Sequence, residues 1–394
     1  MDKNIKKIFA ASYIGYIVQA VVNNLAPLLF LIFAKEFDVG PEKITLLITV
    51  NFGVQLTVDF AASKLVNKIG YKQMTVAAHI FAAAGLAGMG LLTLLPMPYL
   101  WLLISSVTYA VGGGLIEVMI SPIVEACPTD SKSGAMSLLH SFYCWGQVFT
   151  VAMSTVFLSF FGEDNWRILA LMWAAIPLAN AVFFSRLKLY QLQPTGSETG
   201  LRSLFRIKIF WLFALMMVCA GAAELAMSQW ASSYAQKALG MSLEVGNLAG
   251  PCLFALFMGA SRAVYAKFSD KINLLSAITV CCILCIIGYL LASLSPAAVL
   301  GFAGCGLAGF SVGIMWPGIF SLAGAKCREG GTAMFAMLAL AGDLGCMGGP
   351  TVTGFVSGAN GGDLKLGLLF AVIFPLVLGI SAAAFKGREK IKKR

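Results

Sequence analysis

The sequence predicts an all-α integral membrane protein in which twelve transmembrane helices form two pseudo-symmetric bundles of six. Three observations lead to this fold class. Of the 394 residues, 59% are hydrophobic and only 12% are charged, whereas soluble domains are nearer half apolar and a quarter charged. The apolar residues are gathered in long runs. The two halves of the chain also carry similar motifs in the same order.

Each apolar run has roughly 20 residues or more, the length that a helix needs to cross a hydrocarbon core of about 30 Å. Backbone polar groups in lipid must be satisfied within the segment, so runs of this length are helices. The first run lacks a small-residue cleavage site and is expected to remain as a helix. The expected helices are 8–34, 43–66, 71–95, 98–126, 133–161, 166–188, 207–236, 243–266, 272–292, 296–325, 330–357 and 363–386.

Positive charge is distributed unevenly among the connecting segments. If both termini are cytoplasmic, most of the 28 lysine and arginine residues lie on the cytoplasmic side, as the positive-inside rule requires. The pattern predicts a multi-pass protein of the cell membrane with both termini inside. It also accounts for the net charge of +10 without a nucleic-acid partner. Membrane lipids are the expected surroundings, and a monomer is the expected state.

A polar, turn-rich interval divides the chain near its middle and is typical of a linker. We expect an N-terminal six-helix bundle at 1–188, a cytoplasmic linker at 189–206, and a C-terminal six-helix bundle with a basic tail at 207–394. Gly114 and Pro122 in the first half match Gly309 and Pro317 in the second at one constant spacing. Parallel repeats of this kind place a substrate site between the halves, near the middle of the membrane.

Several kinds of chemistry lack their motifs. No Gly-x-x-x-x-Gly-Lys-Ser/Thr segment occurs, so ATP hydrolysis is not expected and any transport must use a gradient. The histidines, His79 and His140, have no helical carboxylate at metal-site spacing. The ten cysteines lie mostly within apolar runs, where they are expected to pack as small apolar residues. We therefore expect no cofactor, no metal centre and no enzymatic activity.

Twelve helices in two repeats, with short basic loops at equivalent places, resemble the major facilitator superfamily. The loop at 63–72, Ser-Lys-Leu-Val-Asn-Lys-Ile-Gly-Tyr-Lys, is similar to the helix 2–3 loop of that family, although the first glycine and the acidic residue are replaced. The resemblance implies a transporter with the major facilitator fold.

A narrower resemblance is to the fucose permease branch, which consists of sugar:proton symporters. It rests on Asn23-Asn24-Leu25, on Gly114-Leu-Ile-Glu117, and on Gly221-Ala-Ala-Glu224 followed by Trp230. The family's helix 4 glutamate takes part in proton coupling and sugar recognition, and this resemblance implies the same for Glu117. The chain departs from the family in having Ala26-Pro27 where an aspartate is usual, and Ser121 before the helix 4 proline.

Charged groups inside apolar helices are costly and commonly functional. Glu117, Glu224 and Asp343 are the candidate proton-coupling residues, because such acids can bind and release protons near neutral pH. No lysine or arginine is expected at the same depth in the membrane as these acids. A cavity with acids and no fixed cation would disfavour an anionic substrate. The structural alternatives are a helix–helix hydrogen bond for Glu117, a bond to Ser228 or Gln229 for Glu224, and tight helix packing for Asp343.

Uncharged polar side chains supply the donors and acceptors that hydroxyl groups need. Gln19 and Asn23 are one helical turn apart, as are Asn51 and Gln55, so each pair shares a helix face. The candidate substrate-binding residues are Gln19, Asn23, Asn24, Asn51, Gln55, Gln147, Gln229, Trp230 and Trp316. The candidate gating residues, nearer the cytoplasmic helix ends, are Asp59, Lys64, Glu125, Arg262 and His140. Packing is the alternative for His140, and lipid contact for the aromatic residues.

The leading hypothesis is a secondary active transporter that carries a small polar solute. In this hypothesis the solute is a sugar, and transport occurs by proton-coupled symport and alternating access. Sodium is an open alternative to the proton. A proton-driven exporter of lipophilic or cationic compounds is also compatible with acidic residues in a membrane cavity. A membrane-embedded enzyme or sensor lacks a soluble domain, a catalytic dyad and a metal motif.

Overall fold

The computed structural model describes residues 3–129, 132–190, 201–268, 273–327 and 331–392. The chain divides into two compact units, Met1–Pro194 and Thr195–Arg394, here called the N-terminal and C-terminal units. Each unit is described by itself. The expected linker at 189–206 has its central part, 191–200, outside the described residues.

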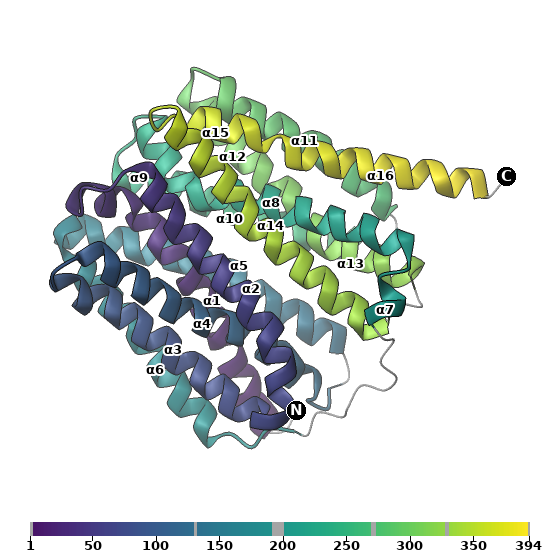
Figure 1. Ribbon diagram of the computed structural model, residues 1–394, viewed down its shortest axis with the longest axis horizontal. Coiled ribbons are helices and arrows are strands. Elements are labelled where there is room, and N and C mark those ends of the chain that lie inside the picture. The colour runs from purple at the N-terminus through teal and green to yellow at the C-terminus, as the bar shows by residue number, and fades with distance from the viewer. Residues whose placement is uncertain (1–2, 130–131, 191–200, 269–272, 328–330, 393–394) are drawn as a thin grey trace. The chain divides into compact units, whose positions relative to one another are not determined.

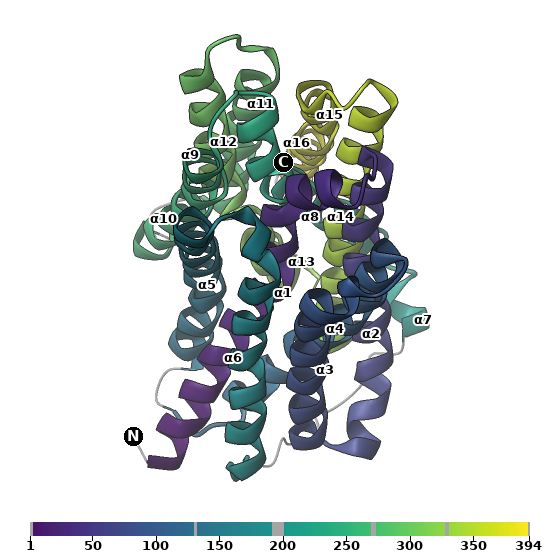
Figure 2. The same ribbon diagram turned by 90° about the vertical axis from the view of Figure 1, so that its left-hand side faces the viewer.

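The N-terminal unit consists of six long helices and two short 3-10 turns. Helix α3 packs against both α4 and α6, α1 packs against α5, and α2 packs against α4 (Figures 1 and 2). The elements are α1 (Lys3–Glu36), α2 (Pro41–Ile69), α3 (Tyr71–Leu91), η1 (Leu92–Leu94), α4 (Pro98–Glu125), α5 (Lys132–Phe161), η2 (Glu163–Asn165) and α6 (Trp166–Arg186).

The C-terminal unit is also helical, but more of its helices are divided. Helix α8 packs along α14, and α11 packs along α12 (Figure 1). The elements are α7 (Leu201–Leu204), α8 (Lys208–Lys237), α9 (Leu243–Asn247), the π-helical segment η3 (Leu248–Cys252), α10 (Leu253–Phe268), α11 (Leu274–Leu294), α12 (Ala298–Val312), α13 (Met315–Lys326), α14 (Gly331–Ala359), α15 (Leu364–Ala371) and α16 (Ile373–Lys392).

Twelve membrane-length apolar helical spans occur in the described parts of the chain, and this confirms the predicted fold class. Three of these spans are divided into shorter helical elements, at η3, after α12 and after α15. A proline lies within or shortly after each division: Pro251 lies within η3, and Pro317 and Pro375 follow the ends of α12 and α15. A proline has no N–H to donate to the carbonyl four residues earlier, and its ring clashes with that carbonyl. Each of these three membrane spans therefore consists of more than one helical element.

Close backbone contacts hold α3 against α4. A Cβ atom added to Gly85 would lie 2.3 Å from the backbone nitrogen of Tyr109, and one added to Gly112 would lie 2.5 Å from that of Ala82. Only glycine permits this separation. Small residues are typical of membrane helix interfaces because they let backbones approach closely.

His79 of α3 is fully buried in the packing of the N-terminal unit. Its Nδ1 lies 2.7 Å from the carbonyl oxygen of Thr75, and its Nε2 lies 2.8 Å from Nδ2 of Asn180. Because the Thr75 carbonyl can only accept, Nδ1 carries the hydrogen and Nε2 accepts from Asn180. The same Asn180 amide donates to the carbonyl of Ala11. His79 thus joins α3 to α6, and through Asn180 to α1.

Candidate functional site

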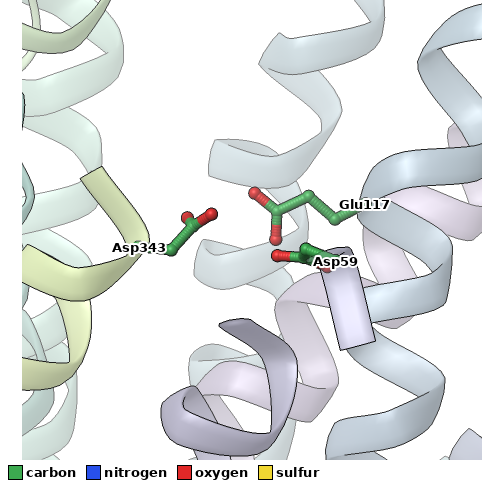
Figure 3. A group of neighbouring side chains, drawn as sticks. All are labelled: Asp59, Glu117 and Asp343. Atoms are coloured by element: carbon green, nitrogen blue, oxygen red, sulfur yellow. The ribbon is translucent and has the colours of Figure 1, made fainter. Parts of the chain in front are cut away.

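Two acidic side chains of the N-terminal unit lie close together. Asp59 on α2 and Glu117 on α4 have carboxylate oxygens within 4.8 Å of one another, and Figure 3 shows both carboxylates turned toward the same space. Asp59 is 7% exposed, whereas Glu117 is exposed. At this separation, two ionised carboxylates would repel by about 3.5 kcal/mol at an effective dielectric constant of about 20. A proton held by either group removes this repulsion.

A chain of buried amides runs from Glu117 into the unit. Gln19 Nε2 donates to Glu117 Oε2 at 3.0 Å and to Gln55 Oε1 at 3.1 Å. Gln55 Nε2 then donates to Asn23 Oδ1 at 2.8 Å and to Asn51 Oδ1 at 3.1 Å. The chain links α1, α2 and α4. Both hydrogens of each glutamine amide are therefore used within it.

The amide chain continues to an aromatic residue on α5. Asn51 Nδ2 donates to Asn23 Oδ1 at 3.4 Å, and Asn23 Nδ2 donates to the Tyr143 hydroxyl at the same distance. Each of the four amide residues is no more than 6% exposed. We call Gln19, Asn23, Asn51 and Gln55 the amide chain, with Glu117 at one end and Tyr143 at the other.

Two glycines of α4 allow this arrangement. A Cβ atom added to Gly114 would lie 3.0 Å from Asp59 Oδ1 and 3.1 Å from the Gln55 backbone. One added to Gly113 would lie 3.3 Å from Gln19 Oε1. All three separations are tighter than ordinary side-chain contacts. The glycines thus let α4 approach the amides and Asp59 closely enough for Glu117 to join them.

Tyrosines near Glu117 were not among the predicted site residues. The Tyr16 hydroxyl hydrogen-bonds to the Ser121 hydroxyl at 2.8 Å, one helical turn beyond Glu117. The Tyr16 ring meets the ring of the exposed His140 edge-on, with centroids 5.2 Å apart. Tyr16 and Tyr143 lie in apolar runs in which aromatic residues are common, so their sequence positions carried no distinguishing signal.

In the C-terminal unit, Glu224 lies beside a cation. Arg262 Nη2 is 4.0 Å from Glu224 Oε2, and Arg262 Nε donates to the carbonyl oxygen of Gly313 at 3.1 Å. In a continuous α-helix the Gly313 carbonyl would accept a hydrogen bond from the backbone N–H of residue 317, but residue 317 is a proline and has no N–H. Arg262 thus supplies the donor that Pro317 lacks. The expectation that no arginine reaches the depth of the acids was wrong, because the long side chain extends along α10 to this helix break.

Asp343 belongs to α14 and has intermediate exposure. A Cβ atom added to the preceding residue, Gly342, would lie 2.1 Å from the indole ring of Trp316. The Trp316 ring therefore covers the backbone next to Asp343. Figure 3 labels Asp343 as well, but its role in proton coupling stays a prediction.

The other candidates occupy more varied places. Asn24 donates within its own helix to the Ala20 carbonyl. Trp230 is buried and donates to the Pro350 carbonyl at 2.9 Å, which joins α8 to α14, and its contact with substrate stays a prediction. Gln147 and Gln229 are buried, and Glu125 is exposed at the end of α4. The side chain of Lys64 lies outside the described part of the chain.

The whole chain resembles known membrane transporters in fold. A bacterial homologue of the human lysosomal transporter Spinster, inward-facing and unoccupied, aligns over 98% of both chains with a TM-score of 0.78 and 14% identity. The E. coli fucose:proton symporter aligns over 97% of this chain and 99% of its own, with a TM-score of 0.67 and 19% identity. Identities this low establish the fold alone.

No curated protein matches the chain in sequence. The profile of the Major Facilitator Superfamily, in contrast, matches residues 12–350. This match includes the acid pair, the amide chain and most of the C-terminal unit. The chain therefore belongs to the Major Facilitator Superfamily.

Proposed function

We propose that the protein moves a small polar solute, a sugar, across the membrane by proton-coupled symport and alternating access. As a superfamily member it is a multi-pass membrane transporter of small molecules. The observation that carries the proposal is the exposed Glu117 carboxylate, bonded to the buried amide chain and within 4.8 Å of Asp59. Glu224 and Asp343 are further proton-coupling candidates in the other unit.

Glu117 is the proposed proton carrier because its carboxylate is exposed and a second carboxylate, that of Asp59, lies close to it. Its side chain is exposed, so a proton can reach it, whereas Asp59 is almost wholly buried. The repulsion between the two carboxylates favours a state in which one proton resides on the pair. A carboxylic acid that alternates between ionised and neutral forms during transport couples the solute to the proton gradient.

A neutral sugar suits the polar groups around this acid. Amide and hydroxyl groups both donate and accept, as recognition of sugar hydroxyls requires. The fold likeness to the fucose:proton symporter points to the same solute class. Because Arg262 offers a positive charge in the C-terminal unit, a sugar that carries an acidic group belongs among the substrates to test.

Orientation follows from charge. We propose that both termini are cytoplasmic in the cell membrane, because basic residues are concentrated in segments that this orientation places inside. The protein acts as a monomer in this proposal. Asp59, Lys64, Glu125, Arg262 and His140 remain the proposed gating residues.

Export of lipophilic cations is the second candidate, favoured by one observation. Two carboxylates within 4.8 Å can attract a cationic compound as well as a proton. In that case a proton gradient would drive efflux of a dye such as ethidium, and sugars would neither bind nor compete.

Proteoliposomes distinguish these functions. We expect addition of the transported sugar, tested from a panel that begins with L-fucose, to alkalinise the bath as protons enter with it. Sodium at constant pH should leave uptake unchanged. Ethidium efflux without sugar-dependent proton movement would replace symport by export, and sodium-stimulated uptake would transfer the coupling to sodium.

A further inference from the structure

Glu224 and Arg262 of the C-terminal unit lie close together without a hydrogen bond between them. Arg262 Nη2 is 4.0 Å from Glu224 Oε2, whereas a direct bond between a guanidinium and a carboxylate measures about 2.7–2.9 Å. Among the described residues, no hydrogen bond is donated to Glu224. The side chain of Arg262 is 30% exposed and that of Glu224 is 13% exposed. The Glu224 carboxylate is therefore accessible and has acceptor capacity that the fold leaves unused.

The guanidinium group of Arg262 is held in place by the helix break after α12. Its Nε donates to the Gly313 carbonyl at 3.1 Å, and its Nη2 lies 3.8 Å from the Met258 sulfur. A Cβ atom added to Gly313 would lie 2.7 Å from the Met258 backbone oxygen, so α10 and α12 touch at this break. Because the guanidinium is planar and rigid, fixing Nε restricts the direction of Nη2 as well. A group that is ordered in advance binds a ligand with a smaller loss of entropy.

A hydroxyl group matches the two facing atoms. Its hydrogen can be donated to Glu224 Oε2 while its oxygen accepts from Arg262 Nη2. Two bonds of about 2.8 Å that meet at about 90° at the hydroxyl oxygen span a separation of 4.0 Å between the outer atoms. Both bonds involve a charged partner, and such bonds are roughly twice as strong as neutral ones.

Charged ligand groups fit this pair less well than a hydroxyl. A carboxylate would be attracted to Arg262 but repelled by an ionised Glu224, and an ammonium group would be attracted to Glu224 but repelled by Arg262. A methyl group would offer neither residue a hydrogen bond. A neutral group that both donates and accepts satisfies the two residues together, and sugars carry several such groups.

We propose that Glu224 and Arg262 together bind one hydroxyl group of a neutral sugar, so that both are substrate-binding residues of the C-terminal unit. Glu224 accepts a hydrogen bond from this hydroxyl, and Arg262 Nη2 donates one to it. The inference rests on the proposed function in that the solute is a sugar. It gives Glu224 a role in recognition that is separate from the coupling role proposed for Glu117.

Calorimetric binding to the purified full chain tests this contact. The probes are L-fucose, D-galactose and D-glucose, the monodeoxy analogues of each, and D-galacturonate. We expect Glu224→Gln to bind the neutral sugar about tenfold more weakly than the native protein, because a hydrogen bond to a neutral amide replaces one to a charged group. For one monodeoxy analogue, the loss of affinity caused by the missing hydroxyl should be about tenfold smaller in Glu224→Gln than in the native protein, since the two changes remove the same interaction.

Glu163→Gln serves as the matched control, because it makes the same chemical change at an exposed position in η2 and should keep the native affinities. If Glu224→Gln does not fold, Glu224→Asp replaces it, since the shorter side chain withdraws the carboxylate from the hydroxyl. Affinity for D-galacturonate relative to D-galactose should rise in Glu224→Gln, because the repulsion is removed while Arg262 remains. At saturating sugar in proteoliposomes, Glu224→Gln should still accumulate sugar with protons.

Three results contradict the inference alone. The first is an unchanged affinity for the neutral sugar in the Glu224 variant that folds. The second is a weaker affinity in which every deoxy analogue keeps its native loss, which would show that Glu224 acts on binding only through the fold. The third is tighter binding of D-galacturonate than of D-galactose by the native protein. Failure of every neutral sugar to bind the native protein would instead overturn the proposed function, and the inference with it.

Discussion

Glu117→Gln is the substitution that most directly tests proton coupling. The glutamine carbonyl can accept the hydrogen bond that Gln19 Nε2 now donates at 3.0 Å, so the amide chain and its packing should persist. The variant cannot bind or release a proton at this position. Solute binding and exchange should therefore survive while energised accumulation is lost.

The size of the effect follows from the driving force. One proton that enters with a neutral solute contributes about 2.3 kcal/mol per 100 mV of membrane potential, which corresponds to about 50-fold accumulation. In Glu117→Gln the ratio of inside to outside solute should fall to about one. Uptake by the native protein should increase as the outside pH falls, and uptake by the variant should not depend on pH.

Labelled sugar in proteoliposomes, with an imposed potential, measures both quantities. Exchange of labelled for unlabelled sugar without a gradient reports whether the variant still binds and transports. Glu163→Gln makes the same chemical change at an exposed position in η2 and should retain accumulation. Accumulation well above one in Glu117→Gln would refute the coupling role, and equal loss of exchange would show a binding or folding defect.

Two predictions concern the C-terminal unit, both measured by thermal unfolding of purified protein. Gly345→Ala places a Cβ atom 2.0 Å from a backbone oxygen of α8 and should destabilise the folded protein by at least about 1–3 kcal/mol. In Gly348→Ala the added Cβ atom meets nothing within 4 Å, so this control should be neutral or stabilising. Equal effects of the two substitutions would contradict the observed packing of α14 against α8. Arg262→Met leaves the buried Gly313 carbonyl without its donor and should destabilise by about 1–3 kcal/mol. Glu224→Gln should reduce stability by less than Arg262→Met, because the 4.0 Å ion pair between the two residues is partly exposed. A larger loss of stability in Glu224→Gln would show that the ion pair contributes more than the bond to the Gly313 carbonyl.

The sequence was sufficient for the fold because the bilayer imposes a simple rule. Long apolar runs must be helices, and the structure confirms twelve spans in the described residues. It was also sufficient for part of the site geometry. The one-turn spacing of Asn51 and Gln55 predicted a shared face, and the two side chains are hydrogen-bonded at 3.1 Å.

Contacts between helices were less accessible to sequence reasoning. The place of Asp59 near a helix end makes it a gating candidate, but it does not predict that the Asp59 carboxylate lies beside Glu117 and Gly114. Which residue of α2 meets which residue of α4 depends on helix tilt and rotation. Neither quantity follows from hydropathy, because packing against neighbouring helices sets both.

Prolines show a similar limit. Pro122 and Pro350 lie inside continuous α-helices, whereas Pro251 lies in the π-helical segment η3, and Pro317 and Pro375 follow helix breaks. The residue type is the same, so the difference must come from what surrounds the carbonyl that each proline leaves without a donor. At Pro317 the surrounding group is Arg262, an arginine on another helix.

This difference separates the two related halves of the chain. Gly114 packs against Gln55 of α2, and its repeat counterpart Gly309 packs against Phe254 of α10, so the scaffold around α4 and α12 is shared. Beyond these glycines, α4 continues through Pro122 and carries Glu117. The matching helix instead breaks at Gly313, where Arg262 binds the free carbonyl. Because the counterpart helix packs through the same glycine without an acid, packing does not require Glu117, and its place beside Asp59 and the amide chain supports the proposed proton coupling.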